Sequence, residues 1–347
     1  MNVADQRIRE GRVYFIAEAG INHNADIDLA EELIEIASSA GADAVKFQTF
    51  SADRLVAKNA DMADYQEERV GDESQREMLR RYELDKADHQ HLIDYASTHD
   101  ITFISTPFDA DSARMLADLG VPAIKVGSGE LTNHPLLETI ANLELPMIVS
   151  TGMGTMDEVR AARDAIRSTS VDLPLALLHC TSSYPCSIDD VNLRSMVSMA
   201  DEFSEPIGYS DHTTHPETPA LAVAAGAQIV EKHFTLDSTL SGPDHEASVE
   251  PDELERSIRL ARLAAEARGT DEKMPVDAEK EMRYTARKSL HASKPLEPGT
   301  KLTESDMKIV RPASGIPPTE YEWAVGKRIV RPVDEGAAIE RTDLDNT

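Results

Sequence analysis

The stretch PIGYSDHTTHPETPALAVAAGAQIVEKH, residues 206–233, contains one complete strand–helix–strand repeat and two histidines. Its first and last runs are β-prone, and the apolar-periodic segment between them, Pro216–Ala225, predicts a helix. His212 follows the first β-prone run and His233 ends the second. Neighbouring parallel strands would carry both imidazoles to the same end of a sheet, where a divalent metal could bind. This pair favours an enzyme.

The same alternation of β-prone and helix-like segments recurs along most of the chain. Helix-like stretches include Asp28–Ala40, Asp109–Leu119, Asp157–Ile166 and Glu250–Ala267, several of which begin with Asp, Ser, Thr or Pro at cap positions. The predicted strands are Val13–Ala17, Ala44–Phe47, Thr102–Ser105, Ala123–Val126, Met147–Ser150, Leu175–His179, Pro206–Tyr209 and Gln228–His233. Eight β/α units favour an α/β fold, a closed (β/α)8 TIM barrel, over an open sheet.

The alternation stops after about residue 270. Residues 271–284 are charged and turn-rich, so we expect a linker between a barrel domain at 1–270 and a second domain at 285–347. Short strands and turns fill the second domain, which predicts a small β-rich unit. About sixty residues are few for an independent core, so this unit should dock against another surface.

Charge and hydropathy exclude several classes of partner. The 347 residues contain 35 Lys and Arg against 63 Asp and Glu, a formal net charge of -28. Such a surface repels nucleic acid phosphates and anionic lipid, so we expect no nucleic acid partner and no membrane. The first apolar run is too short for a signal peptide, and no run approaches the roughly 20 apolar residues that span a bilayer. We therefore expect a cytoplasmic protein.

Polar residues gather where the predicted strands end, the place where TIM barrels carry their active sites. Lys46, Lys125 and Lys232 are informative because each lies inside a strand run, where burial costs solvation unless an anion is present. Two or three such lysines pointing inward would indicate a phosphate or carboxylate ligand. Cys180 and Cys186, by contrast, match no CxxC spacing and are assigned no chemistry.

Nine motifs at these strand ends are found together in one family. In chain order they are FIAEAGINHN, KFQTF, STPFD, KVGSGE, STGM, LHCTSSYP, GYSDHT, EKHFTLD and SGPDHEAS. The chain resembles the sialic acid synthase family over roughly residues 13–345, and its terminal segment resembles that family's antifreeze-like (SAF) domain. The resemblance implies condensation of phosphoenolpyruvate with N-acetylmannosamine, or a close analogue, and water. The products would be N-acetylneuraminate, or a related nonulosonic acid, and phosphate.

The resemblance implies that His212 and His233 are catalytic ligands of a divalent metal. An aldehyde attacked by a carbon nucleophile develops alkoxide charge, which a metal stabilises as a Lewis acid. Two imidazoles suit several metals. The family implies Mn2+, with Mg2+ or Co2+ as alternatives.

Phosphoenolpyruvate carries a phosphate and a carboxylate, so its pocket needs fixed positive charge and hydrogen-bond donors. Lys46, Lys125, Ser128 and Ser150 match the family's phosphoenolpyruvate-binding positions. Gln48 and Thr106 lie beside them in the sequence motifs. We expect all six to bind this substrate.

Two carboxylates match catalytic positions of the family. Glu18 is expected to act on the attacking water and beside the metal, and Glu130 to transfer a proton near carbon two of phosphoenolpyruvate. An alternative for Glu130 is a structural ion pair with Lys125.

The acceptor sugar is expected to contact Ser182, Tyr184, Ser210 and Asp244. Ser182 departs from the Asn that neuraminate synthases often carry at this position, which loosens the assignment of the sugar. Legionaminic acid synthases, which use 2,4-diacetamido-2,4,6-trideoxymannose in the same chemistry, are the alternative.

Arg311 matches a family arginine that reaches the N-acetyl sugar in the opposite subunit's barrel. The resemblance therefore implies a homodimer with a domain-swapped C-terminal domain, which also supplies the surface that a small β-rich unit needs.

Two other classes fit less well. A metal-dependent hydrolase on this barrel would be expected to carry His-x-His after the first strand, where this chain has Asn22-His23-Asn24. A noncatalytic carbohydrate-binding protein would have no use for paired histidines, buried lysines and Glu18 together.

Overall fold

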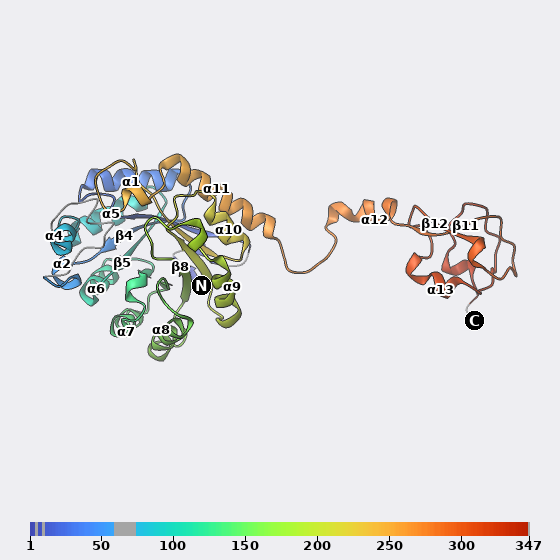
Figure 1. The fold of residues 1–347 in the computed structure, drawn as a ribbon, viewed down its shortest axis with the longest axis horizontal. Helices are drawn as coiled ribbons and strands as arrows, with labels where there is room; N and C mark the ends of the chain where they lie inside the picture. The colour runs from blue at the N-terminus through green and yellow to red at the C-terminus, as the bar shows by residue number, and fades with distance from the viewer. Residues whose placement is uncertain (4–5, 9–10, 59–73, 346–347) are drawn as a thin grey trace. The chain divides into compact units, whose positions relative to one another are not determined.

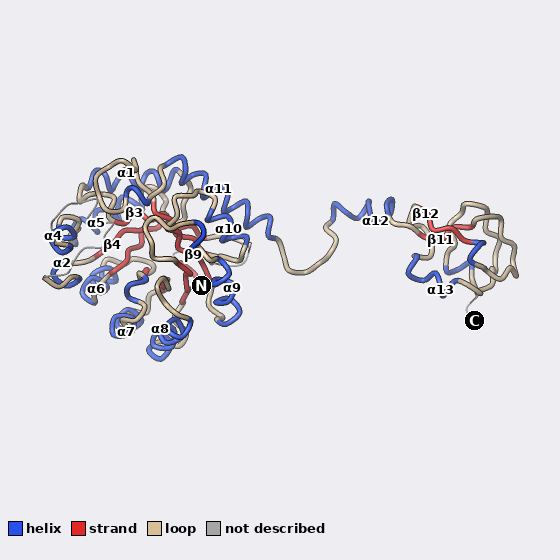
Figure 2. The backbone as a smooth tube through the Cα atoms, viewed as in Figure 1, coloured by secondary structure: helices blue, strands red, loops and turns tan. Residues whose placement is uncertain are grey.

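The computed structural model describes residues 1–3, 6–8, 11–58 and 74–345. The chain forms two compact units, Met1–Gly269 and Thr270–Thr347. In the first unit, helices surround a strand barrel, and short strands with loops dominate the second (Figures 1 and 2).

Eight parallel strands close the barrel in the described part of the first unit, in the order β10-β3-β4-β5-β6-β7-β8-β9. Their bounds are β3 Tyr14–Gly20, β4 Ala44–Thr49, β5 Thr102–Pro107, β6 Ile124–Val126, β7 Met147–Ser150, β8 Leu175–Cys180, β9 Ile207–Asp211 and β10 Ile229–His233. Each of these overlaps a run predicted from the sequence. The (β/α)8 fold is therefore confirmed.

Helices connect these strands and begin at well-defined caps. The side chains of Asp26, Asp85 and Asp109 each accept hydrogen bonds from backbone N–H groups of the following first turn. Such caps stabilise a helix by about 1 kcal/mol each. The helices are α1 Ile27–Ser39, α2 Ala52–Leu55, α4 Gln75–Arg80, α5 Lys86–Thr98, α6 Ala110–Asp118, α7 His134–Ala141, α8 Met156–Thr169, α9 Leu193–Glu202, α10 Thr218–Ala224 and α11 Pro251–Arg268.

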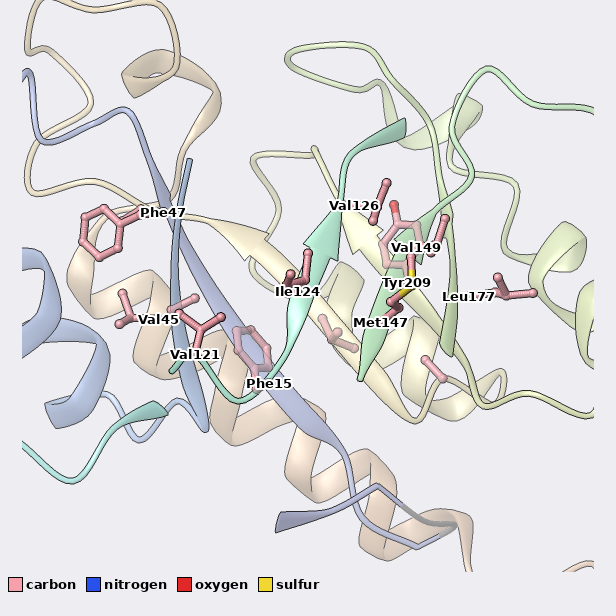
Figure 3. Close-up of a cluster of buried hydrophobic side chains, with 14 of the residues drawn as sticks. Phe15, Val45, Phe47, Val121, Ile124, Val126, Met147, Val149, Leu177 and Tyr209 are labelled. Carbon is pink, nitrogen blue, oxygen red and sulfur yellow. The ribbon is translucent and has the colours of Figure 1, made fainter. Parts of the chain in front are cut away.

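Two apolar layers hold the barrel together. Alternate strand residues such as Phe15, Val45 and Phe47 pack outward, in the layer between strands and helices that Figure 3 shows. Their neighbours Ile16 and Ala44 point inward and fill the amino-terminal half of the barrel. This division follows from the two-residue period of a β-strand, which sends successive side chains to opposite faces.

An N-terminal hairpin packs on the inner apolar layer. Strands β1 (Asn2–Val3) and β2 (Gln6–Arg7) pair antiparallel. Val3 and Ile8 are buried with Tyr14, the first residue of β3, so the hairpin covers the amino-terminal end of the barrel. The opposite, carboxyl end of the strands is left for the polar residues.

The second unit contains one short antiparallel sheet in its described residues, β11 (Ser289–Ala292) paired with β12 (Met307–Val310). Its core is a separate apolar cluster that includes Leu290, Ile316 and Ile339. Further short helices are α12 Lys280–Ala286 and α13 Tyr321–Ala324. The expected linker at 271–284 thus contains the first residues of α12, where the sequence indicates only turns.

No helix within the described residues combines the length and apolar character needed to cross a bilayer. The 18-residue helix α11 illustrates why: it buries one stripe, including Leu254 and Ile258, and otherwise carries mostly charged and small side chains.

Two buried histidines beside the barrel make stability depend on pH. His23 Nδ1 accepts a hydrogen bond from the Ala25 N–H at 2.9 Å, and His245 lies against Thr235. Burial lowers the pKa of each ring from 6.5 to about 4. Because the unfolded chain binds these protons more readily, their contribution to stability is complete above about pH 6.5 and is lost as the pH falls toward 4.

We expect His23→Gln to reduce this acid sensitivity. At about 1.4 kcal/mol per pKa unit, the wild-type protein should lose up to about 3 kcal/mol relative to the variant between pH 6.5 and 4. Thermal unfolding across that range measures the difference. His91→Gln, at an exposed histidine, is the matched control. An unchanged pH dependence in His23→Gln would contradict the assignment.

Candidate active site

A cavity of about 520 Å³ opens at the carboxyl ends of the barrel strands. Every residue of the first unit that the family resemblance assigns to the site lines it. These are Glu18, Lys46, Gln48, Thr106, Lys125, Ser128, Glu130, Ser150, Ser182, Tyr184, Ser210, His212, His233 and Asp244. Arg311 belongs to the second unit, where it is exposed just after β12.

Strand alternation explains why these residues meet. On β4, Ala44 fills the amino-terminal half of the barrel while Lys46 and Gln48, on the same face, reach the cavity. On β10 the same face carries Ile229, Glu231 and His233. These strands thus place apolar side chains in the amino-terminal half of the barrel and polar side chains in the cavity at its carboxyl end, as TIM barrels do.

Lys46 forms one polar centre of the cavity. Its Nζ lies 2.8 Å from Glu18 Oε2 and donates to Thr106 Oγ1 at 2.8 Å. Burial alone would lower the pKa of Lys46, but the facing carboxylates of Glu18 and Glu231 outweigh burial and raise it. Lys46 is therefore a buried permanent cation.

Lys125 supplies a second buried cation beside the first. Its Nζ donates to Ser150 Oγ at 2.6 Å and to the Val126 carbonyl at 3.1 Å, and it lies 3.6 Å from Glu231 Oε1. Burial lowers the pKa of Lys125, against the opposing effect of Glu231. The alternative ion pair with Glu130 is not among the contacts of Lys125 in the described residues, and Glu130 instead accepts a hydrogen bond from Asn133 at 2.6 Å.

Glu231 is a cavity residue that the sequence reasoning missed. It is buried, accepts a hydrogen bond from Ser210 Oγ at 2.9 Å, and lies near both lysines. The signal for it was present, because Glu231 precedes His233 by two residues and so shares its face of the strand. This contact also places Ser210 deep in the cavity.

The two buried carboxylates differ in their protonation. Burial raises the pKa of Glu18 to about 7, partly offset by Lys46. Burial would also raise the pKa of Glu231, but Lys125 and Lys46 outweigh it and lower that pKa to about 2. At neutral pH, Glu231 is a fixed anion, whereas Glu18 exchanges readily between acid and base forms.

Lys232 does not reach the cavity, so two of the two or three lysines expected to point inward, Lys46 and Lys125, do so. It lies between Glu231 and His233 on β10, so alternation turns it to the outer face. There its Nζ donates to Asp211 Oδ2 at 2.6 Å and to the Thr213 carbonyl at 2.8 Å. A buried ion pair, rather than a ligand, compensates the charge.

The small residues Ser128, Gly152 and Ser182 lie together, and we call this group the cradle. The Gly152 N–H donates to Ser128 Oγ at 3.0 Å. Ser182 Oγ is buried and has no hydrogen-bond partner among the described residues. Because a buried unpaired hydroxyl costs free energy, Ser182 is placed to bind a polar group of a ligand.

We expect Gly152→Ala to fill this cradle. An added Cβ would collide with Ser182 Oγ and lie 2.7 Å from Ser128 Oγ. Displacing these donors should raise the KM for an anionic substrate by about tenfold or more, since small misplacements in a site are costly. Steady-state kinetics measures this effect. Gly129→Ala is the matched control, because nothing lies within 4 Å of its added Cβ. Equal KM values in the two variants would contradict a role of the cradle in binding the anionic substrate.

The two predicted metal ligands face each other. The ring centroids of His212 and His233 are 5.3 Å apart, and the Tyr184 ring lies 4.1 Å from that of His212. His212 Nδ1 donates to the Thr181 carbonyl at 2.7 Å, so Nε2 is the nitrogen that could bind a metal. Burial, and next the charge of His212, hold the pKa of His233 well below its ordinary value.

These residues fit a metal ion only in part. Unprotonated imidazole nitrogens are good ligands for transition metals. However, no group of three or more His, Cys, Asp or Glu in the described residues is arranged to hold a metal. A metal here would take two ligands from the protein, one fewer than a typical catalytic zinc site, and the others from substrate or water.

Cys180 is a second cavity residue to which the sequence assigned no role. Its buried Sγ lies 3.7 Å from His212 Nδ1 and 3.6 Å from Ser128 Oγ. Burial alone would raise the pKa of Cys180, but His212 outweighs burial and lowers it; the thiol in turn raises the pKa of His212 against the effect of burial. The spacing of Cys180 and Cys186 in the sequence did not indicate that Cys180 lies in the cavity beside His212.

The side of the cavity formed by α2, α4 and the ends of β4 and β5 is apolar. It contains Phe50, Leu55, Leu79 and Phe108. None of these residues was predicted, because scattered apolar residues resemble core positions in a sequence.

Two family models match the chain. A NeuB family model matches residues 33–273, and a SAF domain model matches residues 287–345. Both compact units are therefore represented in known families.

Curated relatives and solved structures cover nearly the whole chain. An N,N'-diacetyllegionaminic acid synthase from Legionella pneumophila is 44% identical over 330 residues, which cover 94% of this chain and 93% of the relative. The human N-acetylneuraminate-9-phosphate synthase is 34% identical, covering 96% and 93%. The crystal structure of a sialic acid synthetase from Leptospira borgpetersenii in complex with citrate has a TM-score of 0.75 and 34% identity, covering 81% of this chain and 94% of that one.

Proposed function

The chain belongs to the NeuB family of nonulosonic acid synthases, and from that premise we propose that it is a legionaminic acid synthase. It would condense phosphoenolpyruvate with 2,4-diacetamido-2,4,6-trideoxymannose and water, giving N,N'-diacetyllegionaminic acid and phosphate. The sequence analysis placed N-acetylmannosamine first and this acceptor second. The 44% identity to the Legionella pneumophila synthase supports reversing that order.

The buried pair Lys46 and Lys125 is the observation that carries the proposal. Both Nζ atoms lie in one cavity and are held by Thr106, Ser150 and Glu231. Two buried cations with serine donors beside them suit a small ligand that bears both a phosphate and a carboxylate. Phosphoenolpyruvate is such a ligand.

The carboxylates of Glu18 and Glu130 would accept and transfer protons during the reaction of this substrate. Carbon three of phosphoenolpyruvate bonds to the aldehyde carbon of the acceptor, water adds at carbon two, and the tetrahedral adduct expels phosphate to leave the 2-keto acid. Glu18, with its pKa of about 7, would take the proton of that water. Glu130, at the cavity rim, would move a proton as the adduct breaks down.

His212 and His233 would hold a divalent metal, with Mn2+ the first candidate and Mg2+ or Co2+ the alternatives. Such an ion supplies Lewis-acid stabilisation of charge on the acceptor oxygen. The Nε2 of His212 and the neutral ring of His233 support this role.

Arg311 would complete the acceptor site from a second subunit, in a homodimer with exchanged C-terminal domains. Its exposure supports this proposal, as does the lack of an arginine among the described cavity residues.

Mixing inactive Arg311→Ala and His212→Ala chains should restore activity in mixed dimers. In such a dimer, the intact barrel of the Arg311→Ala chain would receive the intact Arg311 of the His212→Ala chain. Failure to recover any activity would contradict the exchange.

A cytoplasmic location, where phosphoenolpyruvate is made, is part of the same proposal.

The function is tested with a panel of acceptors. Purified protein, Mn2+ and phosphoenolpyruvate are mixed with the diacetamido trideoxy sugar, N-acetylmannosamine or N-acetylmannosamine 6-phosphate. Phosphate release and 2-keto acid formation are followed. We expect the highest kcat/KM with the first sugar. A preference for N-acetylmannosamine would instead support the neuraminate alternative, and no product with any sugar would exclude a synthase.

A further inference from the structure

The cavity has two chemically different sides. One side holds the buried lysines, carboxylates and histidines. The other, here called the apolar wall, consists of Ile21, Phe50, Leu55, Val56, Leu79 and Phe108. The wall has no part in the chemistry described so far.

The apolar wall is built on a hydrophobic cluster of its own. Ile21 and Phe50 are buried with Met78 and Tyr82, apart from the main barrel core. The Phe50 and Phe108 rings meet edge to face, with centroids 6.1 Å apart. Of this cluster, Leu55, Leu79 and Phe108 are only partly buried and line the cavity.

Polar contacts fix the short helices that carry the wall. Glu83 Oε1 accepts a hydrogen bond from the Ala52 N–H at 2.6 Å, at the start of α2. Asp53 on α2 accepts from Arg76 Nε on α4 at 2.7 Å, and Arg54 Nε lies 2.9 Å from Asp109. The wall is therefore formed without a ligand, as binding surfaces usually are.

The chemistry of the wall restricts what can lie against it. A sugar hydroxyl placed there would lose water without gaining a hydrogen bond, which is unfavourable. A methyl group would instead gain free energy from burial against the wall. With phosphoenolpyruvate bound by the lysines, the acceptor is the second substrate that could contact the wall.

We propose that the apolar wall binds the methyl groups of the acceptor, its acetamido methyls and the C6 methyl, and so selects a doubly N-acylated 6-deoxy sugar over hexosamines that keep a 6-hydroxyl. This inference rests on the proposed synthase function and assigns acceptor choice to apolar residues that have no catalytic role in it. An apolar pocket discriminates against an added hydroxyl by about 10- to 100-fold. Acceptor preference of that size is expected.

The test replaces Leu79 on α4 by the polar Asn. We expect kcat/KM for 2,4-diacetamido-2,4,6-trideoxymannose to fall about tenfold, through the acceptor KM, because a polar side chain cannot cover its methyls. The KM for phosphoenolpyruvate should not change, and kcat/KM for N-acetylmannosamine should hold or rise. Leu79→Met, which keeps an apolar side chain, should retain the wild-type preference.

The controls separate this inference from the proposed function. Leu263→Asn, at an exposed leucine of α11, makes the same substitution away from the cavity. Thermal unfolding shows whether each variant is folded. An active wild-type enzyme with no preference for the deoxy sugar would overturn the wall assignment. The same holds if Leu79→Asn lowered kcat/KM equally for both sugars or raised the KM for phosphoenolpyruvate. Absence of turnover in the wild type would instead reject the synthase function itself, and the assignment with it.

Discussion

His212→Ala and His233→Ala are each expected to lower kcat/KM by about a thousandfold, because losing one metal ligand removes several kcal/mol of transition-state stabilisation. The ring centroids of the two histidines lie 5.3 Å apart in the cavity, and no group of three or more His, Cys, Asp or Glu in the described residues is arranged to hold a metal. Steady-state kinetics with saturating Mn2+ measures the loss. Electron paramagnetic resonance of added Mn2+ measures binding independently of turnover.

His179→Gln is the matched control for these variants. Its ring lies on the next strand, β8, but donates to the Val191 carbonyl at 2.9 Å and does not line the cavity. This variant should bind Mn2+ and turn over substrate like the wild type. Full activity in either His212→Ala or His233→Ala would remove the two-imidazole site from the mechanism.

Lys46→Met is expected to abolish phosphoenolpyruvate binding and to destabilise the protein. The substitution keeps the side-chain volume but leaves Glu18 and Glu231 buried without their shared cation. Breaking one side of a buried ion pair costs about 3–5 kcal/mol. The pKa of Glu18 should rise further, because Lys46 is the group that lowers it. Calorimetric titration with phosphoenolpyruvate and thermal unfolding measure the two effects.

Lys232→Met separates a binding role from a structural one. Lys232 is also buried and paired, with Asp211, but on the outer face of β10. Its loss should lower stability comparably while the folded protein still binds phosphoenolpyruvate. If Lys46→Met bound phosphoenolpyruvate as well as Lys232→Met does, Lys46 would be structural rather than part of the anion site.

Much of the fold could be predicted because periodicity is a local signal. The run Met147–Ser150 was predicted with the bounds that β7 has, and Leu175–His179 falls one residue short of β8. The helix predicted at Pro216–Ala225 begins two residues later, at Thr218. Boundaries were less certain than the elements because caps and last turns depend on tertiary hydrogen bonds.

The errors at the site have a physical pattern. Lys232 was counted among the two or three candidate inward lysines because its type and position in a motif were weighed without the alternation of the strand. Glu231 was passed over although the same alternation marks it. The apolar wall was not predicted, although Phe50 and Phe108 lie in the motifs KFQTF and STPFD, because its residues come from separate segments and are ordinary core residue types.

The amino-acid sequence alone determined the barrel, the carboxyl-end location of the polar residues and membership of the family, because strand period, helix caps and motif order are all written along the chain. Only the tertiary structure decided that Glu18 titrates near neutrality while Glu231 stays ionised, that Lys232 is a structural cation, and that one side of the cavity is hydrocarbon. These properties depend on burial and on distances between side chains that lie far apart in the sequence, and neither quantity exists until the chain has folded.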